Sequence, residues 1–98
     1  MAIEPVEDRT IVLSGPITVY EVSAVRETLR SALAEGKPLR IDLTDSGPWD
    51  VAGLQLLVSC MKTGQNRDLV VRLVNIPKVC AEIAERSGLS GWFHSSAE

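Results

Sequence analysis

The chain has 98 residues, of which 45% are hydrophobic and 23% charged, so it is expected to form one small globular domain. Ten Lys and Arg against thirteen Asp and Glu give a net charge of −3, which argues against nucleic acid and anionic lipid as partners. No apolar stretch approaches the roughly 20 residues of a membrane span, and the first residues do not resemble a signal peptide. We therefore expect a cytoplasmic protein without membrane insertion, with Cys60 and Cys80 as small buried hydrophobes.

The first half of the chain predicts strands on either side of a helix. A β-branched run over 10–13 predicts a strand, and 3–6 is a candidate edge partner. Residues 18–21 have the Thr-x-x-Glu spacing of a capping box, and the helix that follows is expected to stop at Gly36. Residues 39–43 then alternate apolar and polar side chains, which predicts a second strand.

The second half repeats this order. Residues 44–48 have the composition of a loop, and Asp50 is positioned to cap a helix whose apolar side chains recur from Val51 onward. A nearly continuous aliphatic run over 69–74 suits an interior strand, and a last helix is expected from Pro77 to Gly88.

Together these elements predict an α/β fold. Two strand-helix-strand crossovers imply at least three parallel strands. The short first strand is expected to pair at an edge, giving a four-stranded, mostly parallel but mixed sheet with three to four helices. We expect a single domain over 1–98, with 93–98 as a tail.

An enzyme is poorly supported by the residues. The lone histidine, His94, has no partner for a catalytic pair, and no cysteine and histidine spacing fits a metal, so we expect no cofactor and no metal. Asp42, Asp45 and Asp50 surround the predicted loop after a parallel strand, where α/β sheets place ligands. A small module binding Mg²⁺ and nucleotide through these acids is the alternative from another class, although turn formation and helix capping explain them as well.

The most specific signal lies between residues 41 and 54. A strand with Ile41-Asp42-Leu43 leads to Asp50-Val51-Ala52-Gly53-Leu54 at a helix start, and this arrangement resembles the STAS domain family of anti-sigma factor antagonists. The resemblance extends to Leu13-Ser14-Gly15, to Val74-Asn75-Ile76-Pro77 and to Ser87-Gly88-Leu89, in the same order along nearly the whole chain.

The resemblance implies a non-enzymatic module that binds other proteins and helps to regulate transcription. In the antagonist branch, a kinase-type partner phosphorylates the second hydroxyl residue of the Asp-[Ser/Thr]-[Ser/Thr]-Gly-Leu motif, and the added charge ends binding. Here Val51 and Ala52 replace the two hydroxyl residues, so the phosphoacceptor position holds Ala52 and has no oxygen. Thr18 also replaces an Asp that many relatives carry. Thr44 and Ser46 are the other candidate acceptors near the motif.

Alanine at the acceptor position also suits STAS proteins that serve bacterial phospholipid-transport ABC systems or chemotaxis-type signalling. The resemblance therefore implies a protein partner, either an anti-sigma factor of the kinase type or a transporter ATPase subunit, and a homodimer is possible.

The partner-binding surface is expected around the loop and helix start at 46–55. Its candidate residues are Ser46, Trp49, Asp50, Val51, Ala52, Gly53, Leu54, Gln55 and Thr18. Trp49 has two interpretations, an exposed interface anchor or a lid over the core. Trp92 and Phe93 are expected to close the core or to form a dimer contact.

Overall fold

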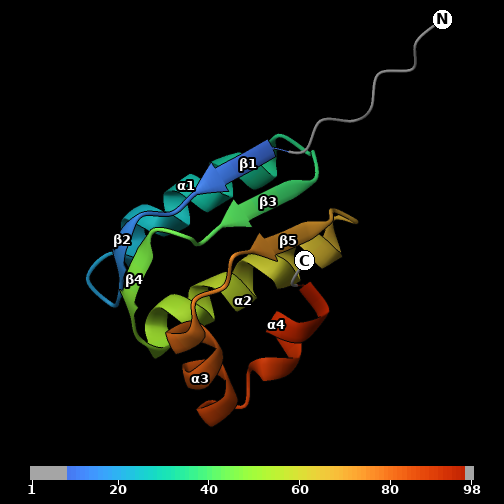
Figure 1. Ribbon diagram of the computed structural model, residues 1–98. Helices are drawn as coiled ribbons and strands as arrows, with labels where there is room; N and C mark the ends of the chain where they lie inside the picture. Colours follow the sequence, from blue (N-terminus) through green and yellow to red (C-terminus); the bar gives the residue numbers. More distant parts are fainter. Residues whose placement is uncertain (1–8, 97–98) are drawn as a thin grey trace, which may run out of the picture.

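The computed structural model describes residues 9–96, with side chains through Phe93, and shows parallel strands packed against helices (Figure 1). The expected strand over 3–6 lies outside the described residues. The elements, in chain order, are β1 Arg9–Val12, β2 Gly15–Ile17, α1 Val22–Ala34, β3 Leu39–Asp42, β4 Ser46–Trp49, α2 Val51–Asn66, β5 Val71–Val74, α3 Lys78–Arg86 and α4 Ser90–Ser96.

The described strands form two small sheets rather than one. The first has the order β1-β3-β5 and the second pairs β2 with β4. In Figure 1 the second sheet lies at the far end of β1 and β3, because β2 and β4 directly follow those strands. Every pairing among the described strands is parallel, which confirms the three parallel strands. The edge strand that would make the sheet mixed is the one expected over 3–6, outside the described residues.

Two strand assignments also need correction. Residues 46–49 were expected in a loop but form β4, where Pro48 is tolerated because the two-stranded sheet leaves that strand at an edge. The aliphatic run over 69–74, which predicted an interior strand, contains β5. Within the described residues β5 pairs only with β3 and therefore lies at the edge of the larger sheet. The helices α2, α3 and α4 contact β5 or each other, and this cover accounts for its apolar sequence.

The helices follow the predicted patterns with two differences. The apolar stripe of α1 faces inward at Leu29, Ala32 and Leu33, and Gly36 follows the helix with φ of +71° as expected. However, α1 begins at Val22, so the predicted capping box forms the turn in front of the helix. A further helix, α4, covers Ser90–Ser96 and buries Phe93, so residues 93–96 are not the tail that we expected.

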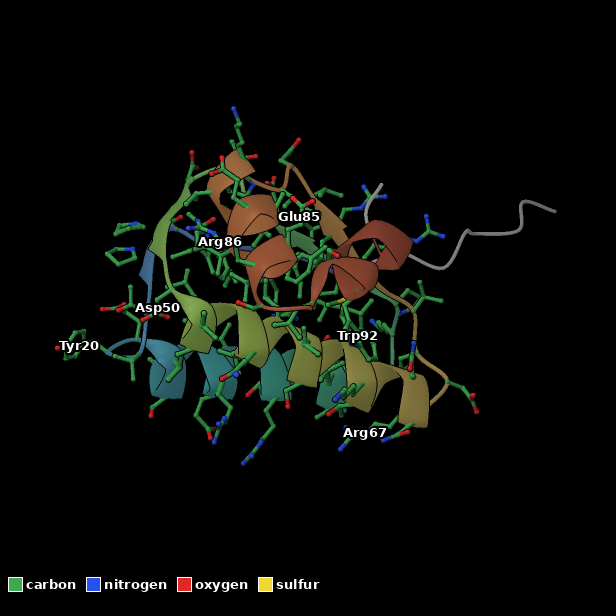
Figure 2. All side chains as sticks on the ribbon, turned by 90° about the horizontal axis from the view of Figure 1, so that it is seen from below. Tyr20, Asp50, Arg67, Glu85, Arg86 and Trp92 are labelled. Carbon is green, nitrogen blue, oxygen red and sulfur yellow. The ribbon has the colours of Figure 1, made fainter. Side chains whose placement is uncertain are left out.

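The core lies between the larger sheet and the helices α1 and α2, which run side by side (Figures 1 and 2). The inward face of β3 and the segment after it are fully buried at Leu39, Ile41 and Leu43, and Leu54 and Leu57 of α2 are equally inaccessible. Cys60 and Cys80 are buried free thiols, as predicted. None of the described helices is long and apolar enough to cross a membrane.

Candidate functional site

The start of α2 is connected to the turn before α1 by a single carboxylate. Asp50 has extended backbone angles, and its side chain accepts a hydrogen bond from the Gly53 amide at 3.0 Å, which confirms the predicted N-cap. Its second carboxylate oxygen, Oδ2, accepts a hydrogen bond from the Val19 amide at 2.9 Å. One residue therefore caps α2 and holds the 18–21 turn against it.

Hydrogen bonds to the charged carboxylate lower the pKa of Asp50. The Val19 amide contributes most, and partial burial opposes it. Within the turn, Glu21 Oε1 accepts hydrogen bonds from the Thr18 amide at 2.9 Å and from Thr18 Oγ1 at 2.6 Å. Asp50 and Glu21 thus keep the backbone of the turn in one conformation beside the helix start.

The fixed turn leaves apolar side chains in solvent. Tyr20 is 90% exposed, Val19 59% and Val51 40%, and Figure 2 shows Tyr20 and Asp50 at the same end of the molecule. We call Thr18, Val19, Tyr20, Asp50, Val51, Ala52 and Gln55 the α2 N-terminal surface; each of them is exposed or partly exposed. Large apolar side chains that remain exposed together are typical of interaction sites.

Val19 and Tyr20 were missed by the sequence analysis. Their position was readable from the sequence, because they are the two central residues of the predicted capping box. Two apolar residues in such positions have no core to enter.

Three of the predicted surface residues are instead part of the core. Trp49 is only 6% exposed and its ring nitrogen donates to Ser46 Oγ at 2.9 Å, so the lid interpretation holds and the exposed anchor is corrected. Leu54 is fully buried. Gly53 is also buried, where a Cβ would collide with the Ile17 carbonyl oxygen, so its missing side chain serves packing within the chain.

Hydroxyl groups near the motif are already engaged. Ser46 Oγ donates to the Leu43 carbonyl oxygen at 2.8 Å while accepting from Trp49, and Thr44 Oγ1 donates to Asp42 Oδ1 at 2.6 Å. Ala52 lies in the first turn of α2, partly exposed, between Val51 and the buried Gly53. Ala52, at the position where the resemblance places the phosphoacceptor, is thus a partly exposed residue with only a methyl side chain.

Two of the three acids of the alternative hypothesis, Asp42 and Asp50, serve separate structural roles. Asp42 accepts hydrogen bonds from Thr44 and from Asn75 Nδ2, and these bonds, with the Thr44 hydroxyl first, lower its pKa. Asp50 is held by Val19 and Gly53, and Asp45 is exposed. Among the described side chains, which run from residue 9 to residue 93, no three acidic, histidine or cysteine groups lie together as a metal site would require, so the Asp42, Asp45 and Asp50 cluster is corrected. The side chain of His94 lies outside the described residues.

At the opposite end of α2, Trp92 and Phe93 behave differently from each other. Phe93 is 3% exposed and closes the core, which was one of the two roles expected for this pair, the other being a dimer contact. Trp92 is partly exposed, and Lys62 Nζ lies 5.6 Å from its ring centroid, within the range of a cation–π contact. A dimer contact through Trp92 stays a prediction.

Comparison with known proteins agrees with this fold. The family model described as "STAS domain" matches residues 2–98. A sulfate transporter family protein from Wolinella succinogenes has a similar structure, with a TM-score of 0.74 and 15% identity, over 98% of this chain and 80% of that one. The unphosphorylated form of the anti-sigma factor antagonist SpoIIAA has a TM-score of 0.64 and 19% identity, over 84% of this chain and 78% of that one. No curated protein matches.

The parallel sheet, the capped helix start and the order of motifs define a small α/β domain of the kind that antagonists of anti-sigma factors use. The chain belongs to the STAS domain family, because the family model spans nearly its whole length.

Proposed function

We propose that this STAS domain is a regulatory module that performs no chemistry of its own and binds another protein through its α2 N-terminal surface. The observation that carries the proposal is the exposure of Tyr20, Val19 and Val51 around Asp50, directly beside the position where relatives carry a phosphoacceptor. Tyrosine combines a large apolar area with few rotatable bonds, which is why it is common among the residues that dominate binding energy.

The proposal includes binding that phosphorylation at position 52 does not control. Ala52 offers no oxygen, and the Thr18, Thr44 and Ser46 hydroxyls all donate hydrogen bonds to other groups of the chain. A kinase would have to break one of those bonds before transferring phosphate. The surface would therefore stay competent for its partner unless control comes from outside this motif.

The partner is proposed to be an anti-sigma factor of the kinase type or an ATPase subunit of a transporter. SpoIIAA and the sulfate transporter family protein share the fold with this chain at 19% and 15% identity, so the choice between the two partners rests on the experiment below. Roles in transcription, phospholipid transport or chemotaxis-type signalling in a bacterial cytoplasm all fit this surface. Two free buried thiols suit a reducing compartment.

Identification of the partner tests the proposal. Proteins retained by the immobilised chain from an extract of its source cells would be identified by mass spectrometry, purified, and titrated calorimetrically against variants. Tyr20→Ser removes the most exposed aromatic ring, and Val70→Ser is the matched control, because Val70 is 50% exposed and precedes β5 at the opposite edge of the sheet.

We expect a kinase-type or transporter ATPase partner whose Kd rises at least tenfold with Tyr20→Ser and stays unchanged with Val70→Ser. Equal affinities for wild type and Tyr20→Ser would place the interface elsewhere. Retention of no such protein would contradict the proposed class of partner.

A further inference from the structure

A pocket of about 300 Å³ opens between α1 and α2, away from the α2 N-terminal surface. Its base is apolar, because Leu29, Leu33, Leu56 and Cys60 line it and are each at least nine-tenths buried. The volume is at the small end of the range for small-molecule sites, which combine an apolar base with a few converging polar groups.

The rim of this pocket is cationic. Arg26 and Arg30 come from successive turns of α1, and Arg67 follows the last turn of α2, so residues far apart in the chain face one cavity. Ser59 and Thr63 add hydroxyl groups to the same lining. Three arginines from the two helices and their ends therefore surround one site.

These arginines have little negative charge to balance them. Within the described part of the chain, neither Arg26 nor Arg67 forms an ion pair. Arg30 approaches Glu27 at 3.7 Å, well beyond the roughly 2.7–2.9 Å of a charge-assisted hydrogen bond, and both side chains are about two-thirds exposed. An anion in the pocket would therefore compete only with water and with this one loose contact.

We propose that the α1–α2 pocket binds a small amphipathic anion, namely a phosphate monoester on a short aliphatic chain. The guanidinium fork of each rim arginine matches phosphate oxygens in a bidentate way that a lysine cannot reproduce. The leucine base would receive the aliphatic chain, whose methylene groups gain free energy by leaving water. The proposal is independent of the partner-binding surface, because its residues do not overlap with that surface.

Calorimetric titration with n-hexyl phosphate tests this site, with inorganic phosphate and hexan-1-ol as separate arms. The double variant Arg30→Gln/Arg67→Gln removes two rim charges, and Arg86→Gln on α3 is the matched control. The three substituted residues, Arg30, Arg67 and Arg86, are all exposed, so both variants are expected to fold. Urea unfolding would verify that their stability is unchanged.

We expect saturable 1:1 binding of hexyl phosphate that weakens at least tenfold in the double variant and is unchanged in Arg86→Gln. Inorganic phosphate and hexanol are each expected to bind at least tenfold more weakly than the ester. Absence of saturable binding, equal affinity for inorganic phosphate, or an unchanged double variant would each overturn the proposal. Saturation by an acidic peptide instead of the ester would also overturn it, and would make this face a protein contact.

Discussion

Gly53 packs its α-carbon against the Ile17 carbonyl oxygen and the ring of Trp49, at the point where α2 meets β2 and β4. An added Cβ would meet that oxygen and would lie 2.9 Å from Trp49 Cε3, so backbone would have to move. We predict that Gly53→Ala lowers the free energy of unfolding by about 1–3 kcal/mol, the usual effect of overpacking. Urea unfolding followed by circular dichroism measures it.

The control is Gly91→Ala in α4, where a Cβ would meet nothing within 4 Å. That variant should change stability by no more than about 1 kcal/mol, and in the stabilising direction. If Gly53→Ala were as harmless as Gly91→Ala, the close contact between α2 and Ile17 would be wrong.

The carboxylate of Asp50 gives stability a pH dependence. Its pKa is lowered in the folded chain, chiefly by the Val19 amide, from the unfolded value of about 3.9. The unfolded state therefore takes up the proton first, so the stabilisation is complete above pH of about 4 and is lost as pH falls through the folded pKa.

The substitution Asp50→Asn keeps an acceptor for the cap but removes the titrating group. We predict that wild type is more stable than Asp50→Asn at pH 7 and that the difference between them shrinks as the pH falls below the unfolded pKa of about 3.9, because the unfolded chain then binds a proton that the native carboxylate does not yet bind. Urea unfolding across this range measures both proteins. A difference that stays constant with pH would show that the charge of Asp50 does not contribute.

Sequence reasoning was most successful for residues whose role is local. Asp50 and Gly36 act on backbone within a few positions of themselves, so a single sequence carries their signal. The burial of Trp49 could not be predicted in this way, because it depends on Ile17 and Gly53, which other elements bring against it. The link from Asp50 to Val19 spans 31 positions and was equally invisible.

At the scale of elements, a side-chain hydrogen bond joins the first and last residues of β4. Ser46 begins the strand, and its Oγ accepts from the Trp49 ring nitrogen while donating to the Leu43 carbonyl oxygen. We predict that Ser46→Ala lowers the free energy of unfolding by about 1–3 kcal/mol, because it leaves the buried Trp49 N–H without its partner.

Trp49→Phe provides the matched comparison, since it removes the N–H together with the need for an acceptor. In the Trp49→Phe background, Ser46→Ala should cost clearly less than in wild type. Chemical denaturation of the two single variants and the double variant completes the cycle. Additive losses would mean that this hydrogen bond does not couple the two residues.

β4 was missed because Ser-Gly-Pro-Trp has the composition of a turn and no alternation to indicate a strand. Its pairing with β2 is imposed by β1 and β3, which deliver the two segments side by side. The helices α1, α2 and α3 and the three parallel strands of the larger sheet could be predicted, because their apolar periodicity is strong over several turns or residues. The split into two sheets arises from tertiary contacts that no local pattern contains.

At the scale of the whole molecule, the two cysteines report on the integrity of the core. Burial raises the pKa of Cys60 to about 11 and that of Cys80 to about 12, so both remain protonated thiols at neutral pH. We predict that iodoacetamide at pH 8 labels the native protein at least a hundredfold more slowly than the protein in urea, because the thiolate is the nucleophile. Mass spectrometry follows both sites, and rapid native labelling of either one would contradict the packing described here.

We propose that Ala52 lies on the partner-binding surface, at the position where the family resemblance places a phosphorylatable hydroxyl. Ala52→Glu places a negative charge there, and the start of a helix tolerates it. Ala81→Glu is the control, since Ala81 is exposed near the start of α3. The decisive measurement is the calorimetric Kd of the identified partner for these two variants, both confirmed as folded. We predict that Ala52→Glu weakens binding at least tenfold and that Ala81→Glu leaves it unchanged, whereas equal affinities for both variants would contradict the account.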